Sequence, residues 1–476
     1  MERARSAMTP SPASSARPSA ELLDEYRRKR HPDRTPEPVP NGSASRRRAK
    51  AKKEPAFVIQ EHHASSLHWD FRLEHDGVLV SWALPKGLPL DPSQNRLAVH
   101  TEDHPMDYAG FQGKIPAGEY GGGAVTIWDS GTYDLEKWSD REVAVAIHGD
   151  RADGRYVLFQ TKGNQWMIHR RDPVPEGWEP LPTHFRPMLA TPGELPKGRG
   201  WAHEFKWDGI RAGVAVEGGR VQIRSRNDLD ITAAFPELRG PGESLGMTTA
   251  FFDGEIVVIG PDGAPKFGLI QHRLHVDSPR VAARLAKETP ASLMIFDLLY
   301  LNGLSLLELP YRDRREVLES LDIGGEFWAV PPAFTGHGSE VMKSAQKNGL
   351  EGVVSKRATS LYRPGRRSDE WIKTKLVHTQ EVVIGGYTAG NGARRETFGA
   401  LLVGIPGDHG LVYVGKVGTG FSERDRTELI DRLRRVRRKT SPFATPPPLP
   451  KSSGAIWVRP TVVGEVQFSE WTSDGY

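Results

Sequence analysis

Short runs of alternating apolar and polar residues, separated by Gly and Pro clusters, fill the first third of this chain after its N-terminal tail. Such runs lie at 57–59, 96–100, 124–128, 155–159 and 166–169. A two-residue period indicates strands with one buried face, and frequent turn residues leave no room for long helices. Residues 56–172 are therefore predicted to form a small β-barrel or sandwich.

The remainder of the 476 residues is long enough for one to three more domains, at roughly 100–200 residues each. Five prolines between 172 and 187 predict a linker at 173–187. Strands and helices mix over 188–378, with predicted strands at 201–205, 211–216, 221–225, 250–259, 293–299 and 352–355 and helices at 280–287, 312–320 and 338–348. A third unit, 379–476, has predicted strands at 382–387, 400–405, 411–417 and 462–468. Its one helix, 423–438, follows Ser422 as N-cap. The pattern predicts a multidomain α+β protein.

The composition of the chain excludes several kinds of catalytic and metal site. The absence of Cys excludes disulfides, iron–sulfur clusters, zinc–cysteine sites and thiol catalysis, so any metal must be held by His, Asp or Glu. No run of about 18 apolar residues is present, and we expect a cytoplasmic, nucleoid-associated protein. Residues 1–53 hold 14 Lys or Arg against 6 Asp or Glu. We expect 1–55 to be a largely disordered basic arm, with a possible short helix at 21–30. The arm could bind a polyanion, or it could serve only to keep the protein soluble.

One short motif raises the possibility of a nucleophilic lysine. Residues 203–211 read His-Glu-Phe-Lys-Trp-Asp-Gly-Ile-Arg. Lys206 and Asp208 alternate at a strand end and so point the same way, and Gly209 then permits a turn. A lysine acts as a nucleophile when burial or nearby cations lower its pKa. Alone, the motif is weak evidence, and a surface turn with a salt bridge explains it better.

Four later segments carry matching chemistry. Glu255 lies in an apolar strand, Phe296 could stack on a base, Glu351 precedes another apolar strand, and residues 371–375 place two lysines on one face. Charges in apolar strands need partners or a metal. Two glutamates and two lysines suit a nucleoside triphosphate with Mg²⁺, because glutamates hold the metal and lysines neutralise phosphates.

The order and spacing of these segments resemble the covalent nucleotidyltransferases, in particular ATP-dependent DNA ligases. The resemblance implies that Lys206 accepts AMP and that a mixed α/β adenylation domain precedes a C-terminal OB-fold barrel. It assigns ATP binding to Glu204, Lys206, Asp208, Arg211, Arg226, Glu255, Phe296, Glu351, Lys373 and Lys375, with Glu255 and Glu351 also at the Mg²⁺. Ligases of this type carry a further basic motif after a segment like 470–475, whereas this chain ends at Tyr476. We therefore expect self-adenylation to be the step most affected.

A second cluster lies in the predicted barrel. His68, Asp70 and Arg72 alternate on one strand and share a face, His62 comes just before them, and residues 102–108 add His104 and Tyr108. Imidazole and carboxylate groups suit Mn²⁺ or Zn²⁺, and neighbouring Arg, Lys and Tyr suit a phosphate. A single His here would indicate only a structural residue.

This stretch resembles the phosphoesterase domain of bacterial DNA ligase D, an end-joining ligase. The resemblance assigns Mn²⁺ to His62, Asp70 and His104. It assigns the scissile phosphate to His68, Arg72, Lys86, Arg96 and Tyr108. Arg30 and Glu37 match functional positions of the family's N-terminal arm, but His31 replaces an aspartate. The implied reaction removes 3′-phosphates or 3′-ribonucleotides and leaves a 3′-hydroxyl.

Together the two resemblances imply an ATP-dependent enzyme that prepares and seals DNA ends. Its expected partners are duplex DNA ends and nicks, Ku, and a separate repair polymerase. Two alternatives remain open at this point: an RNA ligase or capping-type guanylyltransferase, and a DNA-end scaffold with an impaired ligase core.

Overall fold

The structure is a computed structural model that describes residues 19–40, 54–274, 276–376, 378–390, 392, 395–450 and 454–468. The basic run at 46–53 and the C-terminal segment 470–475 lie outside these residues. The chain forms two compact units, one made of Met1–Val341 and Val354–Lys373, the other of Met342–Val353 and Thr374–Tyr476. Within the described ranges, no helix is both long and apolar enough to cross a membrane.

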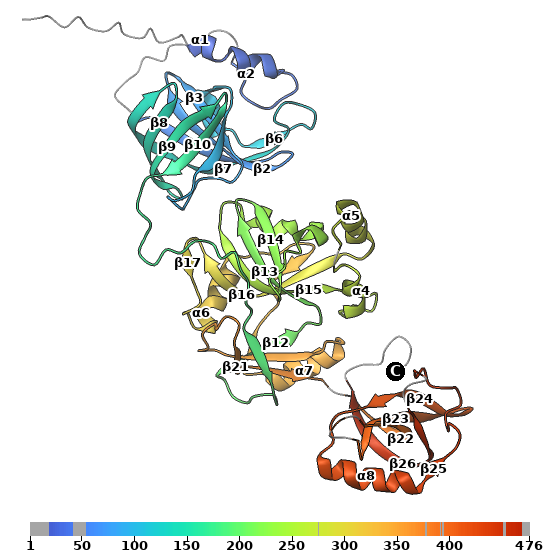
Figure 1. Cartoon of the computed structure of the whole chain (residues 1–476). Coiled ribbons are helices and arrows are strands. Elements are labelled where there is room, and N and C mark those ends of the chain that lie inside the picture. Colours follow the sequence, from blue (N-terminus) through green and yellow to red (C-terminus); the bar gives the residue numbers. More distant parts are fainter. Residues whose placement is uncertain are drawn as a thin grey trace, which may run out of the picture. The chain divides into compact units, whose positions relative to one another are not determined.

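A closed antiparallel barrel occupies the start of the first unit (Figure 1). Its strands follow the order β1-β2-β3-β4-β10-β9-β8-β7, and β7 pairs back with β1 to close the ring; β5 and β6 pair with β3 and β7. The bounds are β1 Ala56–His63, β2 Leu67–His75, β3 Val78–Leu84, β4 Arg96–His100, β5 His104–Pro105, 3₁₀ helix η1 Met106–Gly110, β6 Gly113–Ile115, β7 Gly123–Ser139, β8 Glu142–Gly149, β9 Asp153–Lys162 and β10 Gln165–Arg170.

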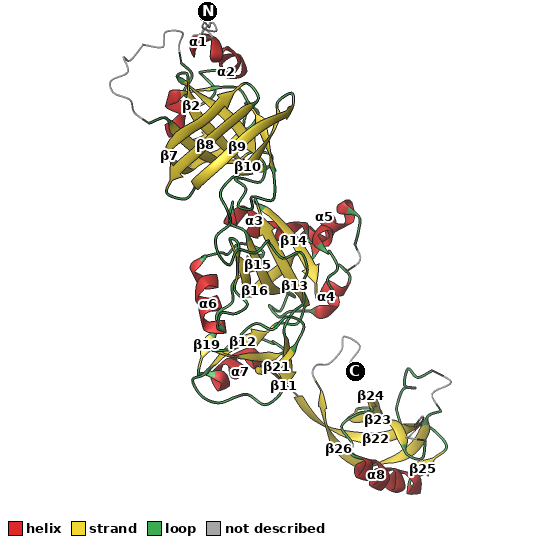
Figure 2. Ribbon diagram, turned by 60° about the vertical axis from the view of Figure 1, so that its left-hand side comes forward, coloured by secondary structure: helices red, strands yellow, loops and turns green. Residues whose placement is uncertain are grey.

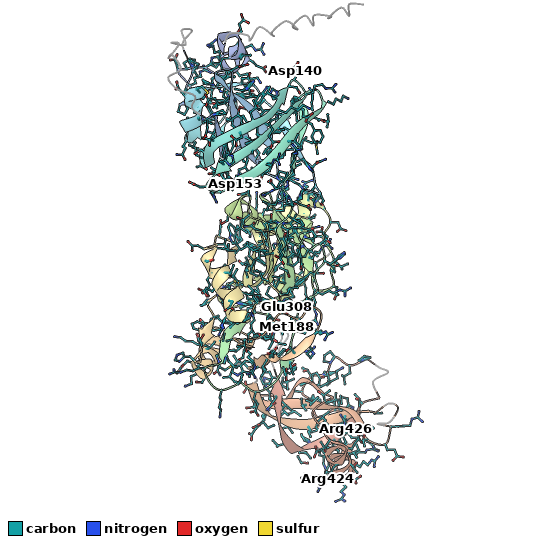
Figure 3. All side chains as sticks on the ribbon, turned by 90° about the vertical axis from the view of Figure 1, so that its left-hand side faces the viewer. Asp140, Asp153, Met188, Glu308, Arg424 and Arg426 are labelled. Atoms are coloured by element: carbon teal, nitrogen blue, oxygen red, sulfur yellow. The ribbon has the colours of Figure 1, made fainter. Side chains whose placement is uncertain are left out.

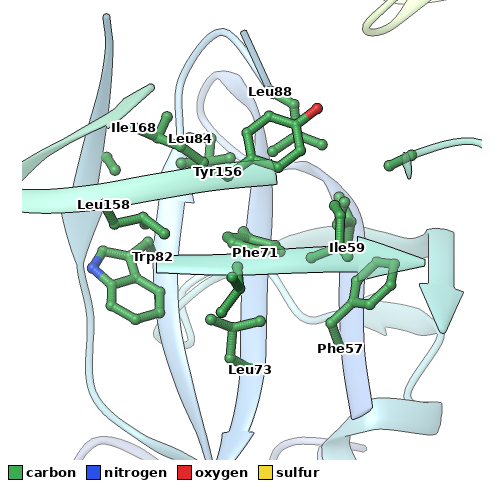
Figure 4. Close-up of a cluster of buried hydrophobic side chains, with 14 of the residues drawn as sticks. Phe57, Ile59, Phe71, Leu73, Trp82, Leu84, Leu88, Tyr156, Leu158 and Ile168 are labelled. Atoms are coloured by element: carbon green, nitrogen blue, oxygen red, sulfur yellow. The ribbon is translucent and has the colours of Figure 1, made fainter. Parts of the chain in front are cut away.

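The barrel interior is apolar and aromatic, as Figure 4 shows. Alternate residues of β1 and β2 fill it, among them Phe57, Ile59 and Phe71, together with Trp82 of β3. The intervening residues of β1 and β2 point to the outer face, because successive side chains of a strand alternate. This outer face holds the polar residues of the predicted cluster, and it is also largely buried.

The N-terminal arm covers that outer face. The arm contains helices α1 Ser19–Leu22 and α2 Asp24–Lys29. Leu23, between the helices, and Tyr26, in α2, pack with Val78, Tyr108 and other apolar residues. Tyr26 is fully buried and donates a 3.0 Å hydrogen bond to the Pro38 carbonyl. The expectation of a largely disordered arm over 1–55 is therefore corrected for residues 19–40. Two apolar side chains and buried ion pairs anchor a segment whose composition is otherwise polar.

Two sheets form the middle of the chain (Figure 2). The first has the order β14-β13-β15-β16-β17, with β18 beside β16, and the second β11-β21-β20-β12-β19. Their strands are β11 Leu189–Pro192, β12 Trp201–Lys206, β13 Ile210–Glu217, β14 Arg220–Ser225, β15 Ala250–Val258, β16 Ala291–Leu301, β17 Leu304–Ser305, β18 Trp328–Ala329, β19 Phe334–Thr335, β20 Gly352–Arg357 and β21 Arg367–Lys375. The helices are η2 Thr232–Ala234, η3 Pro236–Arg239, α3 Gly240–Leu245, α4 Phe267–Gln271, α5 Pro279–Glu288, α6 Tyr311–Ser320 and α7 Gly338–Lys347.

A buried ion pair connects α6 to β16. Arg314, which is fully buried, donates from Nε and NH2 to the two oxygens of Asp297 at 2.8 Å each. Asp297 follows Phe296 in the same strand, so the pair fixes the strand segment that carries the predicted adenine-stacking ring.

Replacing Asp297 with alanine is expected to lower the stability of this unit by about 3 kcal/mol or more, because Arg314 is left buried without its carboxylate. The melting temperature measured by calorimetry tests this. Asp313→Ala is the matched control. The partner of Asp313, Arg312, is exposed, so the free energy of unfolding should fall by less than about 1 kcal/mol. Equal shifts in the two variants would contradict the prediction.

The second unit contains a five-stranded sheet of order β24-β23-β22-β26-β25, with α8 packed against it (Figure 2). Its elements are β22 His378–Ala389, β23 Phe398–Gly407, β24 Gly410–Val417, α8 Glu423–Arg435, β25 Arg437–Arg438 and β26 Ile456–Phe468. This matches the predicted OB-type barrel. Ser422 caps α8 through a capping box with Asp425, which confirms the predicted start.

Helix α8 differs from its prediction at its C-terminal end. It ends at Arg435 rather than at residue 438, because Arg437 and Arg438 pair with β26 instead. Its arginines also have different environments (Figure 3). The Arg424 side chain is 86% exposed, whereas Arg426 is buried and donates to the carbonyls of Phe398 and Gly418. The helix therefore carries one structural arginine among solvated ones.

Candidate functional sites

A cavity of about 210 Å³ lies at the end of β12. Lys206, the last residue of that strand, lines it. The walls come from several other strands and loops, so residues far apart in sequence converge here. The predicted ATP-binding residues that line the cavity are Glu204, Lys206, Arg211, Arg226, Glu255, Phe296 and Lys373.

Three predicted residues do not line this cavity. Lys375 and Glu351 form an ion pair of 2.5 Å with each other, in the second compact unit. Asp208 follows Lys206 and acts electrostatically on Glu255. The strand alternation that placed Lys373 and Lys375 on one face is correct for β21, but the strand leaves the cavity before its last residue.

Arg211 serves as an anchor inside the site. Its guanidinium donates two hydrogen bonds, of 2.5 and 2.7 Å, to the buried carboxylate of Asp253. This ion pair raises the pKa of Arg211 even though burial alone would lower it. The same guanidinium lies 4.6 Å from the centre of the Phe296 ring. The ion pair with Asp253 therefore holds Arg211 in place, and Arg211 in turn contacts the ring that is predicted to stack on adenine.

Lys356 is a site residue that the sequence did not reveal. It lines the cavity yet is only 1% exposed, and its Nζ lies 2.8 Å from a Glu204 oxygen. Burial lowers its pKa, while Glu204 opposes that shift. The amine also lies 4.5 Å from the centre of the Phe296 ring. From sequence, a lysine just after an apolar strand is expected to be exposed to solvent. The sequence does not show the aromatic rings that enclose this lysine.

Glu255 lines the same cavity as the predicted nucleophile, Lys206. Burial raises its pKa to about 7, and the nearby Asp253 and Asp208 also raise it. Arg211 and Lys206 lower it in part. A carboxyl group that is half protonated near neutral pH becomes a good metal or ribose ligand only once it ionises.

The raised pKa of Glu255 predicts a pH dependence of stability. Between pH 4.5 and about 7 the folded chain keeps a proton that the unfolded chain releases, so the free energy of unfolding should fall as pH rises through this window. Melting temperatures measured from pH 5 to 8, without nucleotide or metal, test this. Glu255→Gln should remove that part of the slope. An unchanged slope would contradict the prediction.

The pairing register of β1 and β2 brings together the polar residues of the barrel cluster, His62, His68 and Asp70. His62 pairs directly with His68, and the two rings lie 4.7 Å apart. One ligand atom from each of His62, His68 and Asp70 lies within 4.8 Å of the others. These residues are on the outer face of the barrel and line a cavity of about 200 Å³ under the arm.

Hydrogen bonds fix the tautomers of both histidines. His62 Nε2 lies 2.8 Å from the Gly121 carbonyl and His68 Nδ1 lies 3.0 Å from the Ser66 carbonyl. A carbonyl only accepts, so each of these nitrogens carries the hydrogen. The other nitrogen of each ring is then a lone-pair donor, and both face Asp70, at 3.5 and 3.8 Å. Two lone pairs beside a carboxylate fit a divalent cation between them.

His104 was predicted as the third metal ligand, but the ligand atoms that lie within 4.8 Å of one another belong to His62, His68 and Asp70. The Nδ1 of His104 lies 2.9 Å from an Arg72 nitrogen and its Nε2 lies 3.3 Å from an Arg30 nitrogen. Burial and these two guanidinium groups hold the pKa of His104 well below its usual value. Two fixed positive charges repel a metal ion but attract a phosphate, so His104 belongs with the anion-binding groups.

Arg72 links the two halves of the cluster. It donates to Asp70 at 2.9 Å, to the Gln60 side chain at 2.7 Å and to Ser81 at 2.9 Å. Burial would raise the pKa of Asp70, but the adjacent Arg72 guanidinium lowers it below its usual range. The ionised carboxylate is therefore the form that these surroundings favour. Tyr108, also predicted here, lines the same cavity, with Arg72 over its ring at 4.8 Å.

The arm completes this cavity. Arg30 donates to Glu37 at 2.8 Å and to Glu102 at 2.7 Å, and all three side chains are buried. Tyr108 donates to the same Glu37 at 3.1 Å. The arm residues Arg30 and Glu37 are therefore part of the site, as their resemblance to family positions suggested.

Lys86 and Arg96 are not among the residues lining this cavity, contrary to their predicted place at the phosphate. Arg96 donates to Glu217 at 2.8 Å and to the Leu88 carbonyl at 2.8 Å, and Lys86 lies 3.7 Å from Glu217. Glu217, which lies at the end of β13, supplies a carboxylate that proximity in sequence gave no reason to expect. The two ion pairs with Glu217 account for the positions of Arg96 and Lys86.

Three family matches cover most of the chain. Residues 60–160 match the DNA ligase D 3′-phosphoesterase domain, residues 187–375 the ATP-dependent DNA ligase domain, and residues 394–476 the C-terminal region of ATP-dependent DNA ligases. The chain is also 45% identical, over 96% of its length, to the multifunctional non-homologous end joining protein LigD of Mycolicibacterium smegmatis. Over nearly its whole length the chain is therefore similar to DNA ligase D proteins, and it contains a ligase D phosphoesterase domain and an ATP-dependent DNA ligase domain.

Other LigD proteins are similar along the same span. The LigD of Pseudomonas aeruginosa is 35% identical over 96% of this chain. A crystal structure of the ligase domain from Mycobacterium tuberculosis LigD is 41% identical; it covers 61% of this chain and 91% of that one, with a TM-score of 0.39. The chain spans 59% of the length of the Mycolicibacterium LigD and 60% of the Pseudomonas LigD. Within that span the order is a phosphoesterase domain followed by an ATP-dependent ligase domain.

Proposed function

We propose that this chain removes blocking groups from DNA 3′ ends and seals the resulting ends with ATP, as a step in non-homologous end joining. The observation that carries the proposal is the cavity at Lys206, where a strand-end lysine meets a carboxylate, an aromatic ring and further cations. The barrel cluster adds a second site whose chemistry produces the 3′-hydroxyl that sealing requires. In the domain boundaries proposed above, end processing belongs to 56–172 and sealing to 188–378 together with 379–476.

Sealing proceeds in three displacements at phosphorus. The Lys206 amine attacks the α-phosphorus of ATP, the bond to pyrophosphate breaks, and a lysine–AMP phosphoramidate forms. A DNA 5′-phosphate oxygen then attacks the same phosphorus and releases the amine. The 3′-hydroxyl finally attacks the activated 5′-phosphate and AMP leaves. Arg211 positions Phe296 for the adenine, and Arg226 and Lys373 neutralise phosphate charge.

The residues present fit a divalent metal at both sites. Mg²⁺ at the ligase site would be held by Glu255 and would neutralise the triphosphate. Mn²⁺ at the barrel would be held by His62, His68 and Asp70 and would polarise the 3′-phosphate. Arg72 and Arg30 hold the phosphate oxygens, because guanidinium groups bind them in a fork. His104 and Tyr108 lie beside these guanidinium groups and orient the departing group.

Two assays on the full chain test the proposal. A nicked duplex supplied with ATP and Mg²⁺ should be sealed, and a pre-adenylated nick should be sealed without ATP. A primer with a 3′-phosphate should be converted to a 3′-hydroxyl in the presence of Mn²⁺. Labelling by GTP instead of ATP would indicate a capping-type enzyme. Tight DNA binding without sealing of either nick would indicate a scaffold.

The proposed partners follow from the substrate. DNA ends must be held together before they are sealed, so Ku and a separate polymerase are the expected partners. Stimulation of end joining, but not of nick sealing, by added Ku would support this, since a nick needs no bridging. Equal stimulation of both reactions would argue against it.

A further inference from the structure

One aromatic residue at the barrel cavity differs from all its neighbours. Tyr120 is 47% exposed, whereas Tyr26 and Tyr108 are almost fully buried. Among the described residues that line this cavity, Tyr120 is the one that is exposed. A large ring held at the rim of a charged cavity is available to whatever part of a substrate remains outside.

The backbone around Tyr120 is tied directly to the metal cluster. The carbonyl of the next residue, Gly121, accepts the hydrogen bond from His62. Gly123 then adopts a φ of 154°, and a Cβ there would come within 2.3 Å of the His63 carbonyl. The loop that carries Tyr120 is therefore fixed by the strand that holds His62, and it cannot shift without disturbing that histidine.

The side chain of Tyr120 is held by the arm. Its hydroxyl lies 3.3 Å from Lys29 Nζ and 3.4 Å from a Glu102 oxygen. Lys29 and Arg30 also lie over the ring, at 4.7 and 5.3 Å from its centre. Cations over a ring fix its orientation. The ring is thus pre-positioned beside the cations proposed to hold the phosphate.

We propose that Tyr120 is the positioning residue that stacks on the 3′-terminal base of the DNA. The inference rests on the phosphoesterase function proposed above. With the terminal phosphate among Arg30, Arg72 and the metal cluster, the attached nucleoside must leave the cavity past its rim. Every base has a π-face, so stacking tolerates any sequence, which an enzyme acting on random breaks needs. The class of ligand is a 3′-phosphorylated DNA end with an intact terminal base.

Kinetics on two substrates test the role. One primer carries a 3′-phosphate on a normal nucleotide, and the other carries it on an abasic residue. On the normal primer, Tyr120→Ala should raise KM about tenfold or more with kcat little changed, and Tyr120→Phe should match wild type. On the abasic primer wild type should already have the raised KM, and Tyr120→Ala should add nothing. Trp138→Ala, which removes a barrel aromatic that stacks on His75, is the matched control and should change neither.

Other outcomes overturn the inference. An equal KM increase on both primers, or no increase on the normal one, would exclude base stacking. A loss in Tyr120→Phe equal to that in Tyr120→Ala would assign the role to the hydroxyl instead.

A binding measurement separates this inference from the phosphoesterase proposal. A 3′-phosphorylated primer ending in 2-aminopurine should lose fluorescence on binding wild type and much less on binding Tyr120→Ala. This readout needs no turnover. Quenching without hydrolysis under any metal would sink the phosphoesterase proposal and leave the stacking role standing. Hydrolysis with equal quenching in both proteins would do the reverse.

Discussion

Lys206→Ala is expected to abolish transfer of AMP from ATP to the protein, by a factor of about 10⁴ or more, because no other group replaces a lost nucleophile. The side chain ends β12 and lines the nucleotide cavity. Sealing of a pre-adenylated nick should survive, since that step needs no protein–AMP bond. Removal of 3′-phosphates should also survive.

The measurement is the covalent label left on the protein by radioactive ATP with Mg²⁺. Lys287→Ala provides the matched control, because that lysine lies exposed near the end of α5, and it should label like wild type. Wild-type label that persists in Lys206→Ala would place the nucleophile elsewhere. An unlabelled wild type that still seals a pre-adenylated nick would locate the defect in self-adenylation alone.

The second large effect concerns the metal of the barrel. His68→Ala should weaken Mn²⁺ binding by more than about 100-fold, as His62→Ala should, because a direct ligand matters more than the outer partners whose loss already costs 10–100-fold. His104→Ala should bind Mn²⁺ like wild type and yet lose turnover. This contrast follows from the two arginines that flank His104.

Calorimetry or Mn²⁺ electron paramagnetic resonance gives the affinities directly. His148→Ala is a suitable control, because that ring lies between two exposed aspartates on the barrel surface. Loss of Mn²⁺ binding in His104→Ala with retention in His68→Ala would restore the ligand set that the family resemblance first suggested.

The sequence predicted much of the fold because local signals agreed with the tertiary result. The alternating runs at 57–59 and 155–159 became β1 and β9, and Ser422 began α8. Seven of the predicted nucleotide residues converged because each lies in or next to an apolar strand of the two central sheets, and sequence shows such strands well. Lys356 was missed because the rings around it, Phe296, Tyr311 and Trp371, come from three other elements of the chain. A local pattern around Lys356 does not include them.

The barrel site was predicted less completely. Spacing showed that His68 and Asp70 share a face, but it could not show which ring nitrogens are protonated. That depends on the carbonyls of Ser66 and Gly121, which only the folded chain brings near. The family resemblance assigned Arg96 to the phosphate, and nothing near it in sequence indicated its partner Glu217, which lies 121 residues away. Long-range pairing of charges is information that a pattern along the chain does not carry.

The contact between Arg30 and Glu102 has a consequence for the order in which the protein assembles during synthesis. The arm leaves the ribosome before the strands that receive it, and Glu102 follows Arg30 by 72 residues. The ring of strands itself cannot close until β7 has emerged to meet β1. The pair between Arg30 and Glu102 can therefore form only after residue 102 has been synthesised, and the proposed phosphate site is complete only in a chain that already includes every strand of the barrel.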